Sequence, residues 1–293
     1  MPSDNPTTLQ EGNVPSLLEA GRLDDALQAA TTTLQDARLA AEEDAAHLPL
    51  LVNALESLAE VHRQIGDFEK AESMYQEALE TAEWAKAAPH QMVRLRTGLA
   101  TLYDFNQREE LAISLYEAAI EDYDRMDPPR DQESAQVRNN LAMIYKSLGR
   151  FPLAEQHYLM ALETLEKLHG RNDERVAAVF NNLGSLYYTA GFGEQAKEMH
   201  LEALDIRVHV FGPDHPEVAQ SYCNLATACY ELQDDVGTQQ NYEKSLRIFE
   251  HNFSTCADAY EEVGADYIAV LEAMGEDKKA ETLKKRMAKL LRK

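Results

Sequence analysis

The sequence predicts an all-α protein built as an array of helix–turn–helix repeats. A leucine followed by a small residue, and three positions later by Tyr or Cys, recurs every 42 residues, at Leu99, Leu141, Leu183 and Leu225. A further copy, at Leu58, lies 41 residues before the first of these signature leucines. Periods of this length indicate stacked helical repeats. The scarcity of breakers, with 13 Gly and 10 Pro among 293 residues, favours helix throughout.

Each period contains two helices, as residues 173–214 illustrate. Asp173 is placed to cap the first helix, and Gly191 interrupts the apolar periodicity where that helix ends. Gly212 is expected to end the second helix in a left-handed conformation, and Pro216 suits the first turn of the following helix.

The recurrent small and aromatic residues predict close crossings between helices. A small residue lets two helices approach, and a ring beside it fills the remaining space, with about 1.5–3 kcal/mol gained for each buried ring. The small residues expected on the second helices are Ala71, Ala112, Ala154 and Ala196, and the rings are Tyr75, Tyr116, Tyr158, His200 and Tyr242.

Two segments carry a family resemblance, Asn-Asn-Leu-Gly-Ser-Leu-Tyr at 181–187 and Phe-Gly-Pro-Asp-His-Pro-Glu-Val-Ala at 211–219. They resemble tetratricopeptide repeats, in the long 42-residue form of kinesin light chains. The resemblance covers residues 14 to about 291 and implies a right-handed superhelix, an α-solenoid, that forms one array over 14–293. The expected divisions are a disordered polar tail at 1–13, a partial repeat at 14–46, repeats at about 47–88, 89–130, 131–172, 173–214 and 215–253, and a degenerate capping repeat at 254–293.

Charge and composition restrict the partners. The net charge of −23 disfavours nucleic acid and anionic lipid, and no apolar run is long enough for membrane insertion. The three cysteines form no disulfide framework, which suits a cytoplasmic location. Residues 276–293 carry a net charge of +5. This basic C-terminal helix is interpreted first as a soluble cap, and otherwise as a site of self-association or of anionic partners.

No catalytic, metal or cofactor site is expected. The nine histidines form no His-Glu-x-x-His pair, the cysteines form no Cys-x-x-Cys pair, and no glycine-rich phosphate loop is present. The carboxylates are spread along helix faces without a nucleophile or base beside them. The chain is therefore predicted not to be an enzyme.

The family resemblance implies that the first helix of each repeat lines a concave groove and that the residue before each signature leucine faces it. An asparagine occupies that place in three repeats, and an amide can both donate to and accept from a peptide backbone. We favour this ligand role, and the alternative is that the amides bond to a neighbouring helix or to water. The predicted peptide-binding residues are Asn140, Asn182, Asn224, Asn139, Asn181, Arg94, Lys146 and Tyr188.

The expected function is a non-catalytic scaffold or adaptor that holds an extended peptide or protein segment in the groove. Two alternatives remain open at this point. One is a signalling receptor that senses a peptide or small ligand, and the other is a self-assembling structural scaffold.

Overall fold

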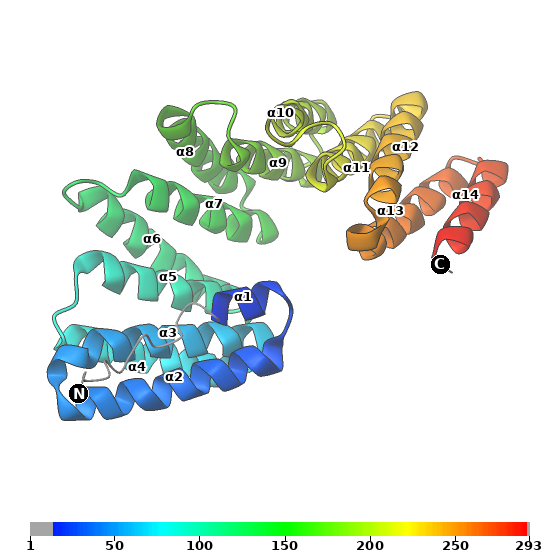
Figure 1. Cartoon of the computed structure of the whole chain (residues 1–293). Coiled ribbons are helices and arrows are strands. Elements are labelled where there is room, and N and C mark those ends of the chain that lie inside the picture. Colours follow the sequence, from blue (N-terminus) through cyan, green and yellow to red (C-terminus); the bar gives the residue numbers. More distant parts are fainter. Residues whose placement is uncertain (1–13, 292–293) are drawn as a thin grey trace. The chain divides into compact units, whose positions relative to one another are not determined.

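The computed structural model describes residues 14–291, so the predicted tail at 1–13 lies outside the described residues. The described part is all-α, with fourteen α-helices, a short 3₁₀ turn at Ala45–His47 and no strand (Figure 1). The helices are α1 (Val14–Glu19), α2 (Leu23–Glu43), α3 (Leu48–Ile65), α4 (Phe68–Trp84), α5 (Pro89–Phe105), α6 (Glu109–Arg125), α7 (Asp131–Ser147), α8 (Phe151–His169), α9 (Glu174–Thr189), α10 (Gly193–Phe211), α11 (Pro216–Glu231), α12 (Asp235–His251), α13 (Phe253–Ala273) and α14 (Asp277–Leu290).

The chain forms two compact units, which are described separately. The N-terminal unit extends to Val137 and the C-terminal unit begins at Arg138, so that the division falls within α7. Inside each unit, consecutive helices pack against each other as antiparallel neighbours joined by short turns.

The predicted packing code is confirmed. The four alanines of the second helices have no exposed surface. The rings beside them are buried as well, with exposed fractions of 4% or less. Both kinds of position are therefore enclosed by neighbouring helices. The residues of the set are Ala71, Ala112, Ala154, Ala196, Tyr75, Tyr116, Tyr158, His200 and Tyr242.

The predicted turns are mostly confirmed, with one correction. Asp173 accepts a hydrogen bond from the backbone of Arg175 and so caps α9, and Gly191 has a positive φ of 81° after that helix. Gly212 also has a positive φ, 85°, but its ψ of 162° is extended. The left-handed cap expected there is wrong, because the chain leaves α10 directly in an extended direction toward Pro216.

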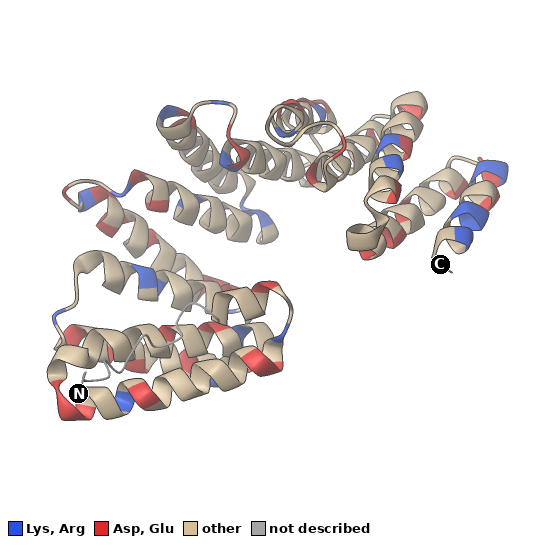
Figure 2. Cartoon of the chain, in the orientation of Figure 1, with Lys and Arg blue, Asp and Glu red and all other residues tan. Residues whose placement is uncertain are grey.

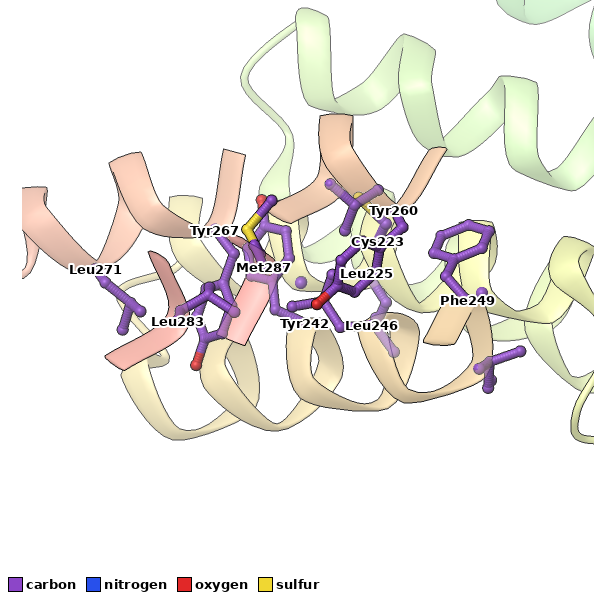
Figure 3. Close-up of a cluster of buried hydrophobic side chains, with 14 of the residues drawn as sticks. Cys223, Leu225, Tyr242, Leu246, Phe249, Tyr260, Tyr267, Leu271, Leu283 and Met287 are labelled. Carbon is purple, nitrogen blue, oxygen red and sulfur yellow. The ribbon is translucent and has the colours of Figure 1, made fainter. Parts of the chain in front are cut away.

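The end of the C-terminal unit has a continuous apolar core (Figure 3). The rings of Tyr242 and Tyr267 stack with their centroids 4.8 Å apart, and thus join α12 to α13. Met287 from α14 packs over Gly264, where a Cβ atom would collide with the thioether. Helix α14 turns an apolar stripe to this core, with Ala280, Leu283 and Met287 buried and Leu290 partly buried.

A hydroxyl pairing recurs between the two helices of a repeat. Thr101, two residues after its signature leucine, lies 2.8 Å from the Tyr116 hydroxyl, and Thr227 is bonded to the Tyr242 hydroxyl in the same way. Of the two repeats between them, the first has Met143 at this position and the second has Ser185. The fully buried Tyr158 hydroxyl accordingly has no hydrogen-bond partner among the described residues.

This difference predicts opposite effects for two equivalent substitutions. Tyr116→Phe is expected to lower the free energy of unfolding by about 1 kcal/mol, because it breaks the bond with Thr101. Tyr158→Phe is expected to be neutral or to stabilise by up to about 1 kcal/mol, because it removes a buried hydroxyl without a partner. Urea denaturation followed by circular dichroism measures both changes. Equal destabilisation by the two variants would contradict the explanation.

Candidate functional site

The predicted asparagines of the C-terminal unit form hydrogen bonds from one repeat to the next. The Asn182 Nδ2 donates to the Asn139 Oδ1 at 2.9 Å, and the Asn224 Nδ2 donates to the Asn181 Oδ1 at 2.6 Å. Within α7, the Asn139 amide also donates to the Asn140 Oδ1 at 3.4 Å. We call these five residues the amide ladder. In both pairs between repeats, the donor is the asparagine directly before a signature leucine. The acceptor is the asparagine two residues before the signature leucine of the previous repeat.

In this structure the asparagines bond to a neighbouring helix, which is the alternative named for them in the sequence analysis. The ladder does not use up their hydrogen-bonding capacity, because each amide has two N–H donors and two acceptor lone pairs. Asn181 and Asn182 lie side by side on α9, and both line a pocket together with Asn224. The ladder therefore holds these three side chains in fixed positions at the wall of the pocket.

Lys146 and Tyr188 lie beside the ladder. The Lys146 Nζ donates to the Ser185 hydroxyl at 2.9 Å, and burial lowers the pKa of the ammonium. Tyr188 is 38% exposed and lines the same pocket. Of the predicted residues, Arg94 is the one that belongs to the N-terminal unit and is described separately.

The pocket, which we call the His200 pocket, has a volume of about 350 Å³ and is built from three consecutive helices of the C-terminal unit. All of its lining side chains are polar and uncharged at neutral pH. Helix α9 supplies four of them, α10 supplies one and α11 supplies three: Asn181, Asn182, Ser185, Tyr188, His200, Gln220, Asn224 and Thr227.

His200 takes the place that tyrosine occupies in the other repeats, and its environment is unusual. The side chain is 4% exposed, and the edge of its ring lies against Gly184, where a Cβ atom would stand 2.6 Å from Cε1 and Nδ1. Its buried Nδ1 has no hydrogen-bond partner in the described part of the chain. Burial, with a contribution from Arg207, lowers the pKa of the imidazole to about 4. The ring is therefore neutral at physiological pH.

Arg94 of the N-terminal unit donates hydrogen bonds to two side chains of the preceding repeat. Its Nη2 donates to the Glu56 Oε2 at 2.6 Å and to the Asn53 Oδ1 at 3.3 Å. Burial raises the pKa of Glu56, although the guanidinium opposes that change. These three residues line a pocket of about 490 Å³. Arg94, a predicted peptide-binding residue, is thus paired with an acid in this structure, and a ligand carboxylate would have to displace that acid.

Lys and Arg gather on α14, the basic C-terminal helix (Figure 2). Several of these cations form ion pairs with acidic side chains of the same chain. Arg286 makes a two-bond contact with Glu250, at 2.6 and 2.8 Å, and a third bond to Glu243 at 2.9 Å. Lys284 pairs with Glu272 at 2.6 Å. These bonds fix α14 to the two preceding helices, as expected for a terminal cap.

Within residues 14–291, no three His, Cys, Asp or Glu side chains are grouped so that they could hold a metal ion. In the same residues, no helix has an apolar stretch of the length that a bilayer crossing requires.

His200 is the functional candidate that sequence reasoning did not select. The sequence assigned it to the core as a replacement for tyrosine, and its burial confirms that part. The signal that distinguishes it is the combination of one histidine in a column of tyrosines with Gly184, rather than alanine, after the signature leucine. Because Gly184 has no Cβ atom, the imidazole of His200 fits against it, and its Nδ1 has no hydrogen-bond partner among the described residues.

Comparison with known proteins supports the family resemblance. A tetratricopeptide repeat family model matches residues 50–125, 133–191 and 175–251. The crystal structure of BtubC (BKLC) from P. vanneervenii is similar, with 34% identity, a TM-score of 0.69, and coverage of 77% of this chain and 90% of that one. A comparison with curated proteins finds no match.

More distant structures share the fold. One is the crystal structure of the nearly identical TPR-like repeats of a putative kinesin light chain from Podosopora anserina. It is 18% identical to this chain, with a TM-score of 0.60, and 69% of this chain and 96% of that one are covered. A Rap protein complexed with Competence and Sporulation Factor has 12% identity and a TM-score of 0.57, with 96% of each chain covered. The family model covers more than half of the chain, and the sequence therefore belongs to the tetratricopeptide repeat family.

Proposed function

We propose that this protein is a non-catalytic interaction scaffold that holds an extended peptide segment of a partner protein against the amide ladder. One observation supports this most strongly. Asparagines of three successive repeats are joined by hydrogen bonds from repeat to repeat, at 2.9 and 2.6 Å, and three of them, Asn181, Asn182 and Asn224, line the His200 pocket. A peptide backbone presents an N–H and a C=O at every residue, and pre-positioned amides can bond to both.

The surroundings of the ladder favour a segment that is neutral or carries few charges. No side chain that lines the His200 pocket is ionised at neutral pH, and the protein carries a net charge of −23. Lys146 and Tyr188 beside it are the residues that we expect to shape specificity. We place the scaffold in the cytoplasm, because its three cysteines are free thiols and burial raises the pKa of Cys223 to about 12.

The proposal is tested with a displayed library of linear random peptides and the full chain as bait. Peptides selected by the wild-type protein are synthesised, and their affinity is measured by calorimetry. The triple variant Asn140→Ala, Asn182→Ala, Asn224→Ala is expected to bind them about 100-fold more weakly, since each lost amide bond weakens binding by about 1 kcal/mol.

A matched control removes three other amides from the C-terminal unit. Gln156, Gln195 and Gln240 are exposed on the second helices α8, α10 and α12, and their joint replacement by alanine is expected to leave the affinity unchanged. Circular dichroism shows whether both triple variants keep their helix content. Wild-type affinity in a folded Asn variant, or the absence of any selected peptide, would overturn the proposal.

A further inference from the structure

We propose that the segment which the scaffold holds carries an Asp or Glu side chain whose carboxylate binds the ammonium of Lys146. This inference rests on the proposed function, since it names one residue of the bound segment. The Lys146 Nζ, on α7, donates to the Ser185 hydroxyl on α9 at 2.9 Å. Asn182 of the amide ladder lies one helical turn before Ser185, and both line the His200 pocket. A segment that contacts the ladder therefore lies close to Lys146.

The ammonium of Lys146 has no acidic partner in the part of the chain that the structure describes. Its hydrogen bond goes to the neutral hydroxyl of Ser185, and no carboxylate of residues 14–291 forms an ion pair with it. Burial lowers the pKa of the ammonium, and no neighbouring acid opposes this change. A cation that is partly withdrawn from water without a counter-charge is destabilised, and a bound anion removes that cost.

This combination distinguishes Lys146 from the other lysines of residues 14–291. Several of these lysines pair with an acid of the same chain, as Lys197 does with Asp234 at 3.3 Å. The lysines that lack such a pair are exposed, so that water solvates their charge: Lys86, Lys167, Lys244, Lys278 and Lys289. Arg94, the other cation predicted to bind a peptide, pairs with Glu56. Lys146 is thus the one lysine of the described residues that is partly buried and lacks an acid.

A ligand can reach this ammonium, and the single charge selects the ligand. Lys146 keeps part of its surface exposed, and Ser185 takes one of its three N–H donors. The remaining donors suit the oxygens of a carboxylate. A phosphate monoester would bring about two negative charges, whereas no second cation acts on the Lys146 ammonium and the protein already carries −23. One carboxylate therefore matches the one ammonium.

The surface around the ammonium suits a peptide side chain. Met143, one turn before Lys146 on α7, is 46% exposed, and Tyr188, one turn after Ser185 on α9, is 38% exposed. Their apolar surfaces can contact the chain on both sides of an acidic residue. Contacts of this kind exclude water and strengthen an ion pair between the carboxylate and the ammonium.

The direct test measures how fast trace acetic anhydride acetylates each lysine of the full chain, by mass spectrometry. The probes are the N-acetyl N-methylamides of aspartate, asparagine and O-phosphoserine. The aspartate probe is expected to slow the acetylation of Lys146 in a saturable way, at a concentration about ten-fold lower than the asparagine probe requires, because a carboxylate holds the amine in its protonated form. Lys167, exposed on α8, is the control in the same spectrum and should react at an unchanged rate. No protection by the aspartate probe, or equal or stronger protection by either other probe, would overturn the inference.

The peptide library gives a second, independent measurement. Peptides selected by the wild-type protein are expected to share an Asp or Glu at one aligned position. Replacing its carboxylate by a carboxamide should weaken binding to the wild type about ten-fold and leave binding to Lys146→Met unchanged. Lys167→Met is the matched control and should keep the ten-fold difference.

The two proposals fail in different ways. Peptide capture without an acidic preference, or with a preference that Lys146→Met retains, would overturn the carboxylate site and leave the scaffold proposal standing. Protection of Lys146 by the aspartate probe in a protein that captures no peptide would overturn the scaffold and support the carboxylate site.

Discussion

Replacing Tyr260 with alanine is expected to lower the free energy of unfolding by about 3–5 kcal/mol. The side chain has no exposed surface, and its ring packs edge-on against Phe253 with the centroids 5.6 Å apart. Its hydroxyl donates to the Glu250 Oε1 at 2.8 Å, on the carboxylate that Arg286 also holds. Truncation would leave a cavity at the junction of α12, α13 and α14 and remove one bond from a charged network.

Urea denaturation followed by circular dichroism measures this loss, and hydrogen exchange localises it. Because each repeat contacts only its neighbours, faster exchange is expected first in α13 and α14. Tyr260→Phe is the matched control, since it keeps the ring and loses only the hydroxyl bond, for about 1–2 kcal/mol. If the two variants lost the same stability, ring packing would not be what holds the last repeat.

The sequence predicted the helices well because their determinants are local and periodic. A small residue is needed after the signature leucine and on the second helix wherever two helices of one repeat cross, so these positions recur with the repeat. On the second helix it is alanine in most repeats and the buried Thr238 in the repeat at 215–253. Ala100, Ala142, Gly184 and Ala226 on the first helices are all in close contact with the neighbouring helix or its ring. The turn residues were harder to predict, because Gln107 and Gln233 adopt positive φ values of 56° and 58° where three other repeats use Gly66, Gly149 and Gly191.

The bonds between repeats were not predictable in the same way. Which side chain of one repeat meets which of the next depends on the rotation from repeat to repeat, and this rotation is set by packing along the whole crossing. The Asn182–Asn139 and Asn224–Asn181 pairs join different positions of the motif. Tyr187 similarly donates to Glu155 on the preceding second helix. The sequence therefore selected the asparagines, whereas their mutual bonds and the pocket beside them required the structure.

The protonation of His200 predicts a pH-dependent stability that His200→Tyr should remove. The pKa of the ring is about 4 in the folded protein, below the ordinary value of 6.5 that the unfolded chain restores. As the pH falls below 6.5, the unfolded state takes up a proton that the folded state refuses, so stability is lost between pH 6.5 and pH 4. At about pH 5.2 the loss relative to pH 7 amounts to about 2 kcal/mol for this one group.

The many carboxylates of the chain also titrate as the pH falls, so the measured quantity is the difference between wild type and variant. Urea denaturation at both pH values, above the isoelectric point of about 4.7, is expected to show a smaller loss for His200→Tyr than for the wild type. His209→Tyr is the matched control, because His209 is exposed on the same helix and its replacement should leave the wild-type pH dependence intact. Parallel losses in wild type and His200→Tyr would mean that the buried ring accepts a proton in the folded state.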